Sequence, residues 1–196
     1  NKTLPLFDLI TSSSFEIKKL MASDRSETEI TNFGNKIGFG GGCHWCTEAV
    51  FSVLEGVVKV EQGWIKSELP FDNYSEGVIV HYDVRKLDLQ TLMKIHLNTH
   101  SSSSDHSMRH LYRSAVYYFQ KPQKAELTRL LTKFSLEDNK IFITQILPFS
   151  GFKENKEEYL QYFKKYKDAP FCKRYIEPKI SHLKNEFPGI IRDNTI

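Results

Sequence analysis

The chain has 196 residues, 40% of them apolar and 26% charged, which is close to the balance of soluble globular proteins. This composition excludes a mostly disordered chain, and the length suits one domain with an appendage or at most two small domains. The 27 Lys and Arg against 24 Asp and Glu leave a net charge of +3, too small to indicate a nucleic-acid partner, and no apolar run is long enough for a transmembrane span.

The first organised segment follows an N-terminal extension. Residues 1–34 alternate polar stretches with short apolar patches and show no sustained period, so we expect an extension that is only partly ordered. A short buried strand is then predicted over 37–39, and it runs into three glycines at 40–42. The apolar spacing that follows predicts a helix over 43–54, with Gly56 as its stop signal.

The middle of the chain predicts a pair of strands and a helix. Residues 57–65 and 77–83 alternate in the manner of strands. The loop between them is too short for a crossover helix, so the two strands should pair antiparallel. Asp88 is a suitable N-cap for an amphipathic helix over 89–96.

The remaining elements complete an α+β pattern. In order, they are a polar loop at 99–111 rich in Ser and His, a strand at 114–119, an amphipathic helix at 121–134, a strand at 140–147, a charged helix at 156–167 and a last helix at 171–187 interrupted near Pro178. This order is not a strict alternation of strand and helix. We therefore expect an α/β sandwich, a mixed and largely antiparallel sheet with helices packed on it and a ferredoxin-like core. A single catalytic domain should span 35–187, followed by a tail at 188–196.

The cysteines are few and odd in number. The chain has only Cys43, Cys46 and Cys172, which argues against a secreted disulfide scaffold and excludes a four-cysteine zinc site. The cysteines are better interpreted as reactive residues or as residues that pack in the core. We expect no metal, no cofactor and a monomer. The compartment stays open: the cytoplasm is favoured, and the cell envelope applies if a removed signal preceded Asn1.

The segment Gly40-Gly41-Gly42-Cys43-His44-Trp45-Cys46 carries the chemistry. A glycine run after a strand lets the backbone turn sharply, and it leaves Cys43 at the start of a helix. The free N–H groups and the positive end of the helix dipole favour an anion there, which makes the thiol more acidic and more nucleophilic. Cys46 lies three residues on and shares a helix face with Cys43, so the two could form a disulfide.

The order of several motifs resembles the A-type peptide methionine sulfoxide reductases. Gly42-Cys43-His44-Trp45 resembles that family's Gly-Cys-Phe-Trp signature. Four further blocks agree in order: Leu54-Glu55-Gly56-Val57-Val58, then Ser75-Glu76-Gly77-Val78 with His81-Tyr82-Asp83, then Tyr112-Arg113-Ser114-Ala115-Val116-Tyr117, and finally Ile146-Leu147-Pro148 with Phe152 and Glu157-Glu158-Tyr159. The resemblance covers about residues 36–183. It implies an enzyme that reduces the S epimer of methionine sulfoxide, free or in oxidised proteins, to methionine.

The resemblance also implies catalytic roles. Cys43 would attack the sulfoxide sulfur and become a sulfenic acid. Glu76 would donate a proton to the sulfoxide oxygen from a carboxyl whose pKa burial raises. Tyr112 would bind the same oxygen through its hydroxyl. Cys46 completes the expected catalytic set, because a second cysteine must condense with the sulfenic acid before thioredoxin or another thiol reductant reduces the disulfide.

Three residues are expected to bind substrate. The resemblance implies that Trp45 packs on the substrate methyl group. His44 stands where the family has Phe, so it would either pack on that methyl group or tune the thiol of Cys43. Tyr74 is a candidate for a hydroxyl donor that the family carries on a longer loop.

The resolving cysteine has two candidates. Cys46 is favoured because only two residues separate it from Cys43. Cys172 could reach the site only if the C-terminal segment folds back over it. A third route has neither cysteine resolve, with an external thiol reducing the sulfenic acid.

Two other classes of function compete with this interpretation. A thioredoxin-like dithiol–disulfide oxidoreductase would use the Cys43-X-X-Cys46 pair alone. A zinc site could combine that pair with histidines of the loop region, although the spacing of these histidines is uneven. The histidines concerned are His96, His100, His106 and His110.

Overall fold

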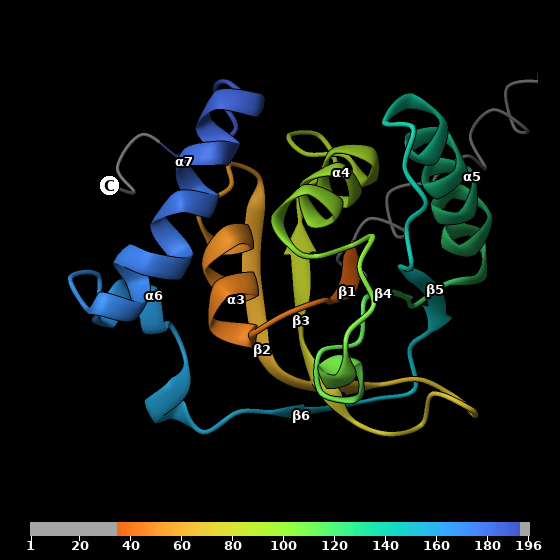
Figure 1. Cartoon of the computed structure of the whole chain (residues 1–196), viewed down its shortest axis with the longest axis horizontal. Coiled ribbons are helices and arrows are strands. Elements are labelled where there is room, and N and C mark those ends of the chain that lie inside the picture. The colour runs from red at the N-terminus through yellow and green to blue at the C-terminus, as the bar shows by residue number, and fades with distance from the viewer. Residues whose placement is uncertain (1–34, 193–196) are drawn as a thin grey trace, which may run out of the picture. The chain divides into compact units, whose positions relative to one another are not determined.

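A six-stranded sheet organises residues 35–192, the part of the chain that the computed structural model describes (Figure 1). The strand order across the sheet is β5-β4-β1-β3-β2-β6. The strands are β1 (Lys36–Gly40), β2 (Val57–Lys66), β3 (Ser75–Tyr82), β4 (Ala115–Tyr118), β5 (Gln145–Pro148) and β6 (Gly151–Glu154). The predicted N-terminal extension at 1–34 and the end of the predicted tail lie outside the described residues.

The helices fall between and after these strands. The α-helices are α3 (His44–Ser52), α4 (Leu89–Thr99), α5 (Lys121–Glu137), α6 (Tyr162–Lys165) and α7 (Glu177–Glu186). Short 3₁₀ turns form η2 (Ser107–His110) and η3 (Glu157–Tyr159), and η4 (Cys172–Ile176) is a π-helix. Within residues 35–192, no helix combines the length and the hydropathy needed to cross a bilayer.

The predicted ferredoxin-like core is confirmed by the strand pairing. The order β1-α3-β2-β3-α4-β4 gives four neighbouring strands, β4-β1-β3-β2, in which every pair is antiparallel. The next crossover, through α5, places β5 parallel to β4. The sheet is therefore mixed and largely antiparallel, as expected.

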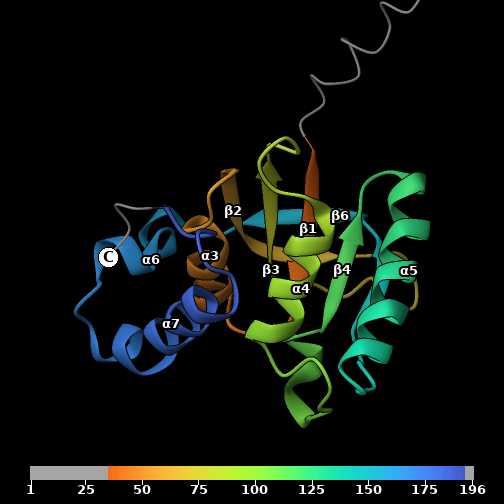
Figure 2. The same ribbon diagram turned by 90° about the horizontal axis from the view of Figure 1, so that it is seen from above.

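The helices cover one face of the sheet. Figure 2 shows α3 and α4 side by side on that face. The larger hydrophobic core lies between the sheet and these helices, and it includes Phe39 of β1, Phe51 of α3, Leu92 of α4 and Leu130 of α5. A smaller cluster on the opposite face gathers around Ile65, Ile79 and Tyr117. The split follows from the alternation along each strand, because successive side chains point to opposite faces.

Local sequence explains several element ends. Asp88 caps α4, since its Oδ1 accepts a hydrogen bond from the N–H of Thr91 at 2.7 Å. Gln120 and Gln123 form a reciprocal capping box at the start of α5. Gly56 has φ +88°, a conformation that suits glycine, in the turn between α3 and β2.

The predicted helix at 156–167 is wrong. Over these residues the chain instead forms the 3₁₀ turn η3 and the single-turn helix α6, and they follow a strand, β6, that was not predicted. The backbone reverses at Gln161, which has φ +55° and donates its N–H to the buried carboxylate of Glu48 at 2.9 Å. A contact 113 residues away in sequence therefore overrides the local helical period.

Two other boundaries differ from the sequence prediction. The strand predicted at 140–147 is reduced to β5, because the N–H of Ile143 donates to the Ser102 carbonyl instead of pairing within the sheet. Pro178 does not interrupt the last helix. It lies in the first turn of α7, where no intrahelical N–H is required, and the irregular segment is the π-helix η4 just before it.

Candidate active site

Cys43 lies at the N-terminus of α3, directly after the glycine turn. It is the N-cap residue, and its carbonyl accepts the first helical hydrogen bond from Thr47 at 3.1 Å. A Cβ on Gly41 would come within 2.5 Å of the His100 ring, so a side chain there would collide with the end of α4. The sharp turn therefore depends on glycine, and it brings Cys43 close to α4.

The surroundings of Cys43 favour the thiolate. A hydrogen bond from the Cys46 thiol is the largest influence that lowers the pKa of Cys43, and the backbone N–H groups of Trp45 and Cys46 act in the same direction. Burial and the nearby Glu76 carboxylate oppose this, but the net direction is downward. A cysteine with a lowered pKa carries more thiolate at neutral pH and is the better nucleophile.

Cys46 serves as the hydrogen-bond donor of the pair. Its pKa is raised by the hydrogen bond to Cys43 and by burial, so its proton stays on. Its side chain is only 9% exposed. The charge of a Cys172 thiolate would raise the pKa of Cys46 further, so the third cysteine lies near the second. Cys172 is fully buried, and burial raises its own pKa.

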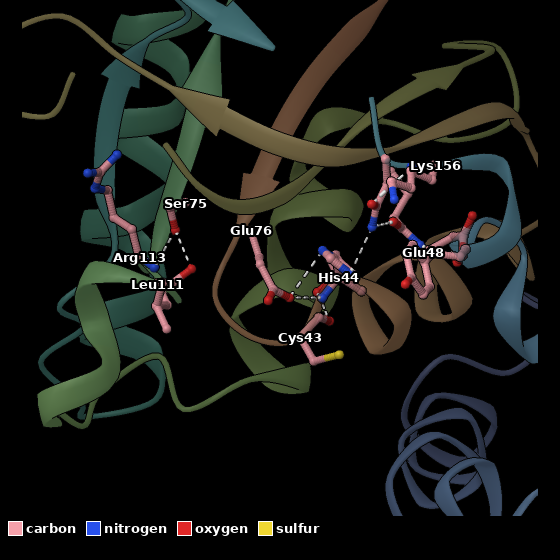
Figure 3. A network of polar contacts seen from close by, with 12 residues as sticks. Cys43, His44, Glu48, Ser75, Glu76, Leu111, Arg113 and Lys156 are labelled. Carbon is pink, nitrogen blue, oxygen red and sulfur yellow. Dashed lines mark hydrogen bonds and ion pairs between the residues drawn. The ribbon is translucent and has the colours of Figure 1, made fainter. Parts of the chain in front are cut away.

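Glu76 of β3 lies beside the first turn of α3 (Figure 3). Its Oε2 accepts a hydrogen bond from the backbone N–H of His44 at 2.9 Å. Burial raises the pKa of this carboxyl, which favours the protonated form. The side chain also acts on Cys43 through its charge, so an acid and a nucleophile share one site.

Tyr112 belongs to the same site. The N–H of Glu76 donates to the carbonyl of Leu111 at 2.9 Å, which holds the segment carrying Tyr112 against the start of β3. The Glu76 carboxylate, and to a smaller extent burial and Cys43, raise the pKa of Tyr112. The Tyr112 hydroxyl therefore keeps its proton beside both groups.

A cavity of about 330 Å³ opens at Cys43. Tyr112 lines it, together with Cys46, His96 of α4 and His100 directly after that helix. The C-terminal segment supplies another wall through Phe171, Tyr175 and Lys179. That segment does fold back over the site, which is the condition that the sequence set for any part played by Cys172.

The two histidines in the cavity wall form hydrogen bonds within the fold. His96 Nε2 lies 2.8 Å from the Gly40 carbonyl, and His100 bridges the His96 carbonyl at 2.6 Å and the Ser114 hydroxyl at 2.7 Å. Within residues 35–192, no three His, Cys, Asp or Glu side chains gather closely enough to hold a metal ion. The described residues therefore offer no donor set for the zinc alternative.

The three expected substrate-binding residues do not line this cavity. Trp45 stacks on Tyr162 with ring centroids 4.2 Å apart and meets Phe171 edge-on at 5.5 Å, so it joins α3 to the C-terminal segment. The ring of Tyr74 lies beneath the ammonium groups of Lys66 and Lys153, at 5.4 and 4.2 Å.

His44 is buried on the side of α3 away from the cavity. It is 7% exposed, and its ring meets Trp64 edge-on at 5.8 Å. Burial lowers the pKa of His44 to about 4, so the imidazole is neutral. A protonated imidazole that would tune Cys43, one of the roles expected for His44, is therefore disfavoured.

Two sets of residues near the site were missed from the sequence. Phe171, Tyr175 and Lys179 recur every four residues, and this spacing could have shown that they share one helix face. The second set consists of the polar residues behind His44, which are Glu48 of α3, Gln62 of β2 and Asn155 after β6. Of these, only Glu48 carried a local signal, since it lies four residues after His44 on α3.

A second cavity of about 740 Å³ is larger but lacks the reactive groups. Glu48, Gln62 and Arg192 are among its lining residues, and Cys43 and Tyr112 are not; Glu76 is among the lining residues of neither cavity. The smaller cavity is the candidate active site because the Cys43 thiol opens into it.

Comparison with known proteins adds a family. A family model described as peptide methionine sulfoxide reductase matches residues 35–189. "Peptide methionine sulfoxide reductase MsrA" of Sulfolobus acidocaldarius is 28% identical over 163 residues, covering 76% of this chain and 93% of the relative. The protein of the same name from Deinococcus radiodurans is 28% identical over 170 residues, covering 79% and 82%.

Solved structures share the fold. Reduced Mxr1 from Saccharomyces cerevisiae superposes with a TM-score of 0.61 at 19% identity, covering 69% of this chain and 87% of that one. Methionine sulfoxide reductase A of Corynebacterium diphtheriae gives a TM-score of 0.58 at 22% identity, covering 68% and 76%. Mxr1 in complex with Trx2 gives 0.53 at 18% identity, covering 64% and 83%.

Proposed function

The chain belongs to the peptide methionine sulfoxide reductase family, as a thiol-dependent enzyme of the A type, and from this premise we propose that Cys43, Glu76 and Tyr112 reduce the S epimer of methionine sulfoxide. One observation supports the assignment above all others. A thiol of lowered pKa opens into a small cavity, and a carboxyl of raised pKa lies near enough to that thiol for its charge to act on it.

The chemical step transfers oxygen from substrate to enzyme. The Cys43 thiolate attacks the sulfoxide sulfur while Glu76 protonates the sulfoxide oxygen, and the Tyr112 hydroxyl hydrogen-bonds to the same oxygen. The attack forms a sulfur–sulfur bond between Cys43 and the substrate, and the sulfur–oxygen bond of the substrate breaks. The hydroxyl then passes to the Cys43 sulfur as the sulfur–sulfur bond breaks, its electron pair stays on the substrate sulfur, and methionine leaves. Cys43 retains the oxygen as a sulfenic acid.

The second step forms a disulfide. The Cys46 thiol attacks the Cys43 sulfenic acid, a sulfur–sulfur bond forms, and water departs. The thiol–thiol hydrogen bond between the two cysteines supports this pairing. The buried Cys172 beside Cys46 is the alternative resolving residue.

A dithiol reductant then restores both thiols. Thioredoxin suits this step because it exchanges its own dithiol for the enzyme's disulfide. The structural neighbour Mxr1 has been solved in complex with Trx2, which supports the same class of partner here. The substrates we propose are methionine sulfoxide residues of oxidised proteins or the free amino acid, and the proposed enzyme is a monomer without a cofactor.

Turnover on resolved epimers tests this assignment. With thioredoxin or dithiothreitol as reductant, we expect reduction of the S epimer of methionine sulfoxide and none of the R epimer. Cys43→Ser should abolish turnover while leaving the fold unchanged by circular dichroism. Retained turnover in that variant would contradict the assigned nucleophile. Reduction of a protein disulfide without any sulfoxide turnover would favour the dithiol–disulfide oxidoreductase instead.

A further inference from the structure

A row of buried and half-buried polar side chains runs from Glu76 into the protein behind Cys43 (Figure 3). His44 is the first member, and Asn155, Gln62 and Glu48 follow. They come from α3, from β2 and from the segment after β6. The mechanism above uses none of these four side chains, although burying so many polar groups next to a proton donor is costly unless they are paired.

The far end of the row fixes the direction of its hydrogen bonds. Gln62 Nε2 donates to Glu48 Oε2 at 3.2 Å and to the Tyr159 carbonyl at 3.0 Å. Two acceptors therefore face the amide nitrogen of Gln62. Its oxygen, Oε1, is left to accept, and it accepts from Asn155 Nδ2 at 2.8 Å.

Asn155 is oriented from two sides. The backbone N–H of Lys156 donates to Asn155 Oδ1 at 3.0 Å, so the amide oxygen faces that group. The nitrogen, Nδ2, therefore faces both Gln62 Oε1 and His44 Nε2, the latter at 3.2 Å. An amide nitrogen can only donate, so His44 Nε2 must present a lone pair.

This contact determines the tautomer of His44. The ring is neutral because burial lowers its pKa to about 4, and a neutral imidazole carries one hydrogen. With a lone pair at Nε2, that hydrogen is on Nδ1. His44 Nδ1 makes no well-aligned hydrogen bond to a described residue, and Oε2 of Glu76 lies 3.2 Å from it.

The consequence appears at Glu76. Its Oε2 already accepts the backbone N–H of His44, and the Nδ1–H of the same residue lies against that oxygen as well. An oxygen that faces two N–H groups cannot also carry the acidic hydrogen without a clash between hydrogens. The other oxygen, Oε1, must carry it.

We propose that His44 is a positioning residue for Glu76: Asn155 holds it as the Nδ1–H tautomer, and its two N–H groups assign the acidic hydrogen of Glu76 to Oε1. This inference rests on the proposed role of Glu76 as the proton donor. It gives His44 a function from the buried side of the carboxyl rather than in the substrate cavity.

The tautomer can be measured without any turnover. Long-range ¹H–¹⁵N correlation spectra of the full chain at neutral pH distinguish the two ring nitrogens of each histidine, and the signal absent in His44→Asn identifies His44. We expect a hydrogen on Nδ1 and a bare Nε2. An Nε2–H tautomer or an imidazolium would overturn the proposal, whether or not the protein reduces sulfoxide.

Kinetics then test the consequence for catalysis. His44→Phe removes the ring nitrogen donor at similar volume, and we expect the single-turnover rate of sulfoxide reduction to fall between about 10- and 100-fold, part of what a positioned acid supplies. His44→Asn places an amide nitrogen near the position of Nδ1 and should recover most of the rate. Asn155→Leu should reduce the rate in the same direction as His44→Phe.

His81→Asn is the matched control. His81 also contacts a glutamate, Glu61, at 2.5 Å, but on the opposite side of the strand pair from the site, so we expect an unchanged rate. Equal rates for His44→Phe and wild type would overturn the proposal. Equal losses in His44→Phe and His44→Asn would also overturn it, because a merely structural ring would not be rescued by a donor. A wild-type chain without sulfoxide turnover would contradict the proposed function, and the spectra would still decide the tautomer.

Discussion

The pKa values of Cys43, at the start of α3, and of Glu76, on the neighbouring strand β3, are shifted in opposite directions, and both shifts suit the proposed reaction. The Cys46 thiol and two backbone N–H groups lower the pKa of Cys43, so a thiolate forms more readily. Burial raises the pKa of Glu76, so this carboxyl retains its proton closer to neutral pH. A nucleophile without its proton and an acid with its proton can therefore coexist in one pH range.

Glu76→Gln tests the proton donor. The variant keeps the shape and loses the acidic hydrogen, so we expect the single-turnover rate to fall by about 10² to 10⁴. The wild-type rate should decline as pH rises through the raised pKa of Glu76, because the donor is protonated only below it. The variant should lack this alkaline decline. A rate near that of wild type would place the proton donor elsewhere.

At the scale of elements, α3 and the C-terminal segment meet around the cysteines. The first turn of α3 holds Cys43 and Cys46, and the π-helix η4 buries Cys172 close to Cys46. Trp45 stacks on Tyr162 and contacts the edge of Phe171, so it packs α3 against the C-terminal segment. A disulfide between Cys43 and Cys46 would require the first turn of α3 to open, whereas one to Cys172 would require movement of η4.

Mass spectrometry after one equivalent of sulfoxide separates these routes. We expect a Cys43–Cys46 link in the wild type and in Cys172→Ser. In Cys46→Ser, the Cys43 sulfenic acid should accumulate and react with a 1,3-dione probe. A Cys43–Cys172 link in the wild type would reverse the assignment of the resolving residue.

At the scale of the whole molecule, the buried histidines make stability depend on pH. Burial lowers the pKa of His44 and of His100 to about 4, and it also lowers the pKa of His96 well below its usual value. In the unfolded chain, these rings take up protons below about pH 6.5, whereas the folded chain resists protonation. The free energy of unfolding should therefore fall as pH decreases from 7 toward 4. The buried carboxyls Glu48 and Glu76, with raised pKa values, oppose this trend.

His100→Asn isolates one histidine from this sum. A shift from 6.5 to about 4 corresponds to a loss of about 2 kcal/mol between pH 7 and pH 5. Urea unfolding gives the free energy of unfolding at pH 7 and at pH 5. We expect the difference between these two values to be smaller by about 2 kcal/mol in His100→Asn than in wild type. His110→Asn, at an exposed position on η2, is the control and should leave the difference unchanged. Identical pH dependence in His100→Asn and wild type would contradict the interpretation.

Local pattern was sufficient to predict the core of this fold and the position of Cys43, the proposed nucleophile. The alternation in the strands, the glycine turn and the Asp88 cap all act within a few residues, so they can be recognised from the sequence. Cys43 was identified for the same reason, since a strand, a glycine turn and a helix place it at a helix N-terminus. The helix predicted at 156–167 was wrong because the N–H of Gln161 donates to Glu48, 113 residues away in sequence, instead of to a carbonyl within a helix.

The sequence by itself determined the family, the antiparallel core and the position of Cys43 at a helix N-terminus, because each depends on contiguous motifs. Only the tertiary structure placed Phe171, Tyr175 and Lys179 over Cys43 and moved Trp45 out of the cavity lining. The tertiary structure alone showed that His44 contacts Asn155, 111 residues away in sequence. The proposed orientation of Glu76 depends on this contact. The physical reason is that burial and hydrogen bonding between distant segments leave no period in the sequence, and they exist only once the sheet has brought those segments together.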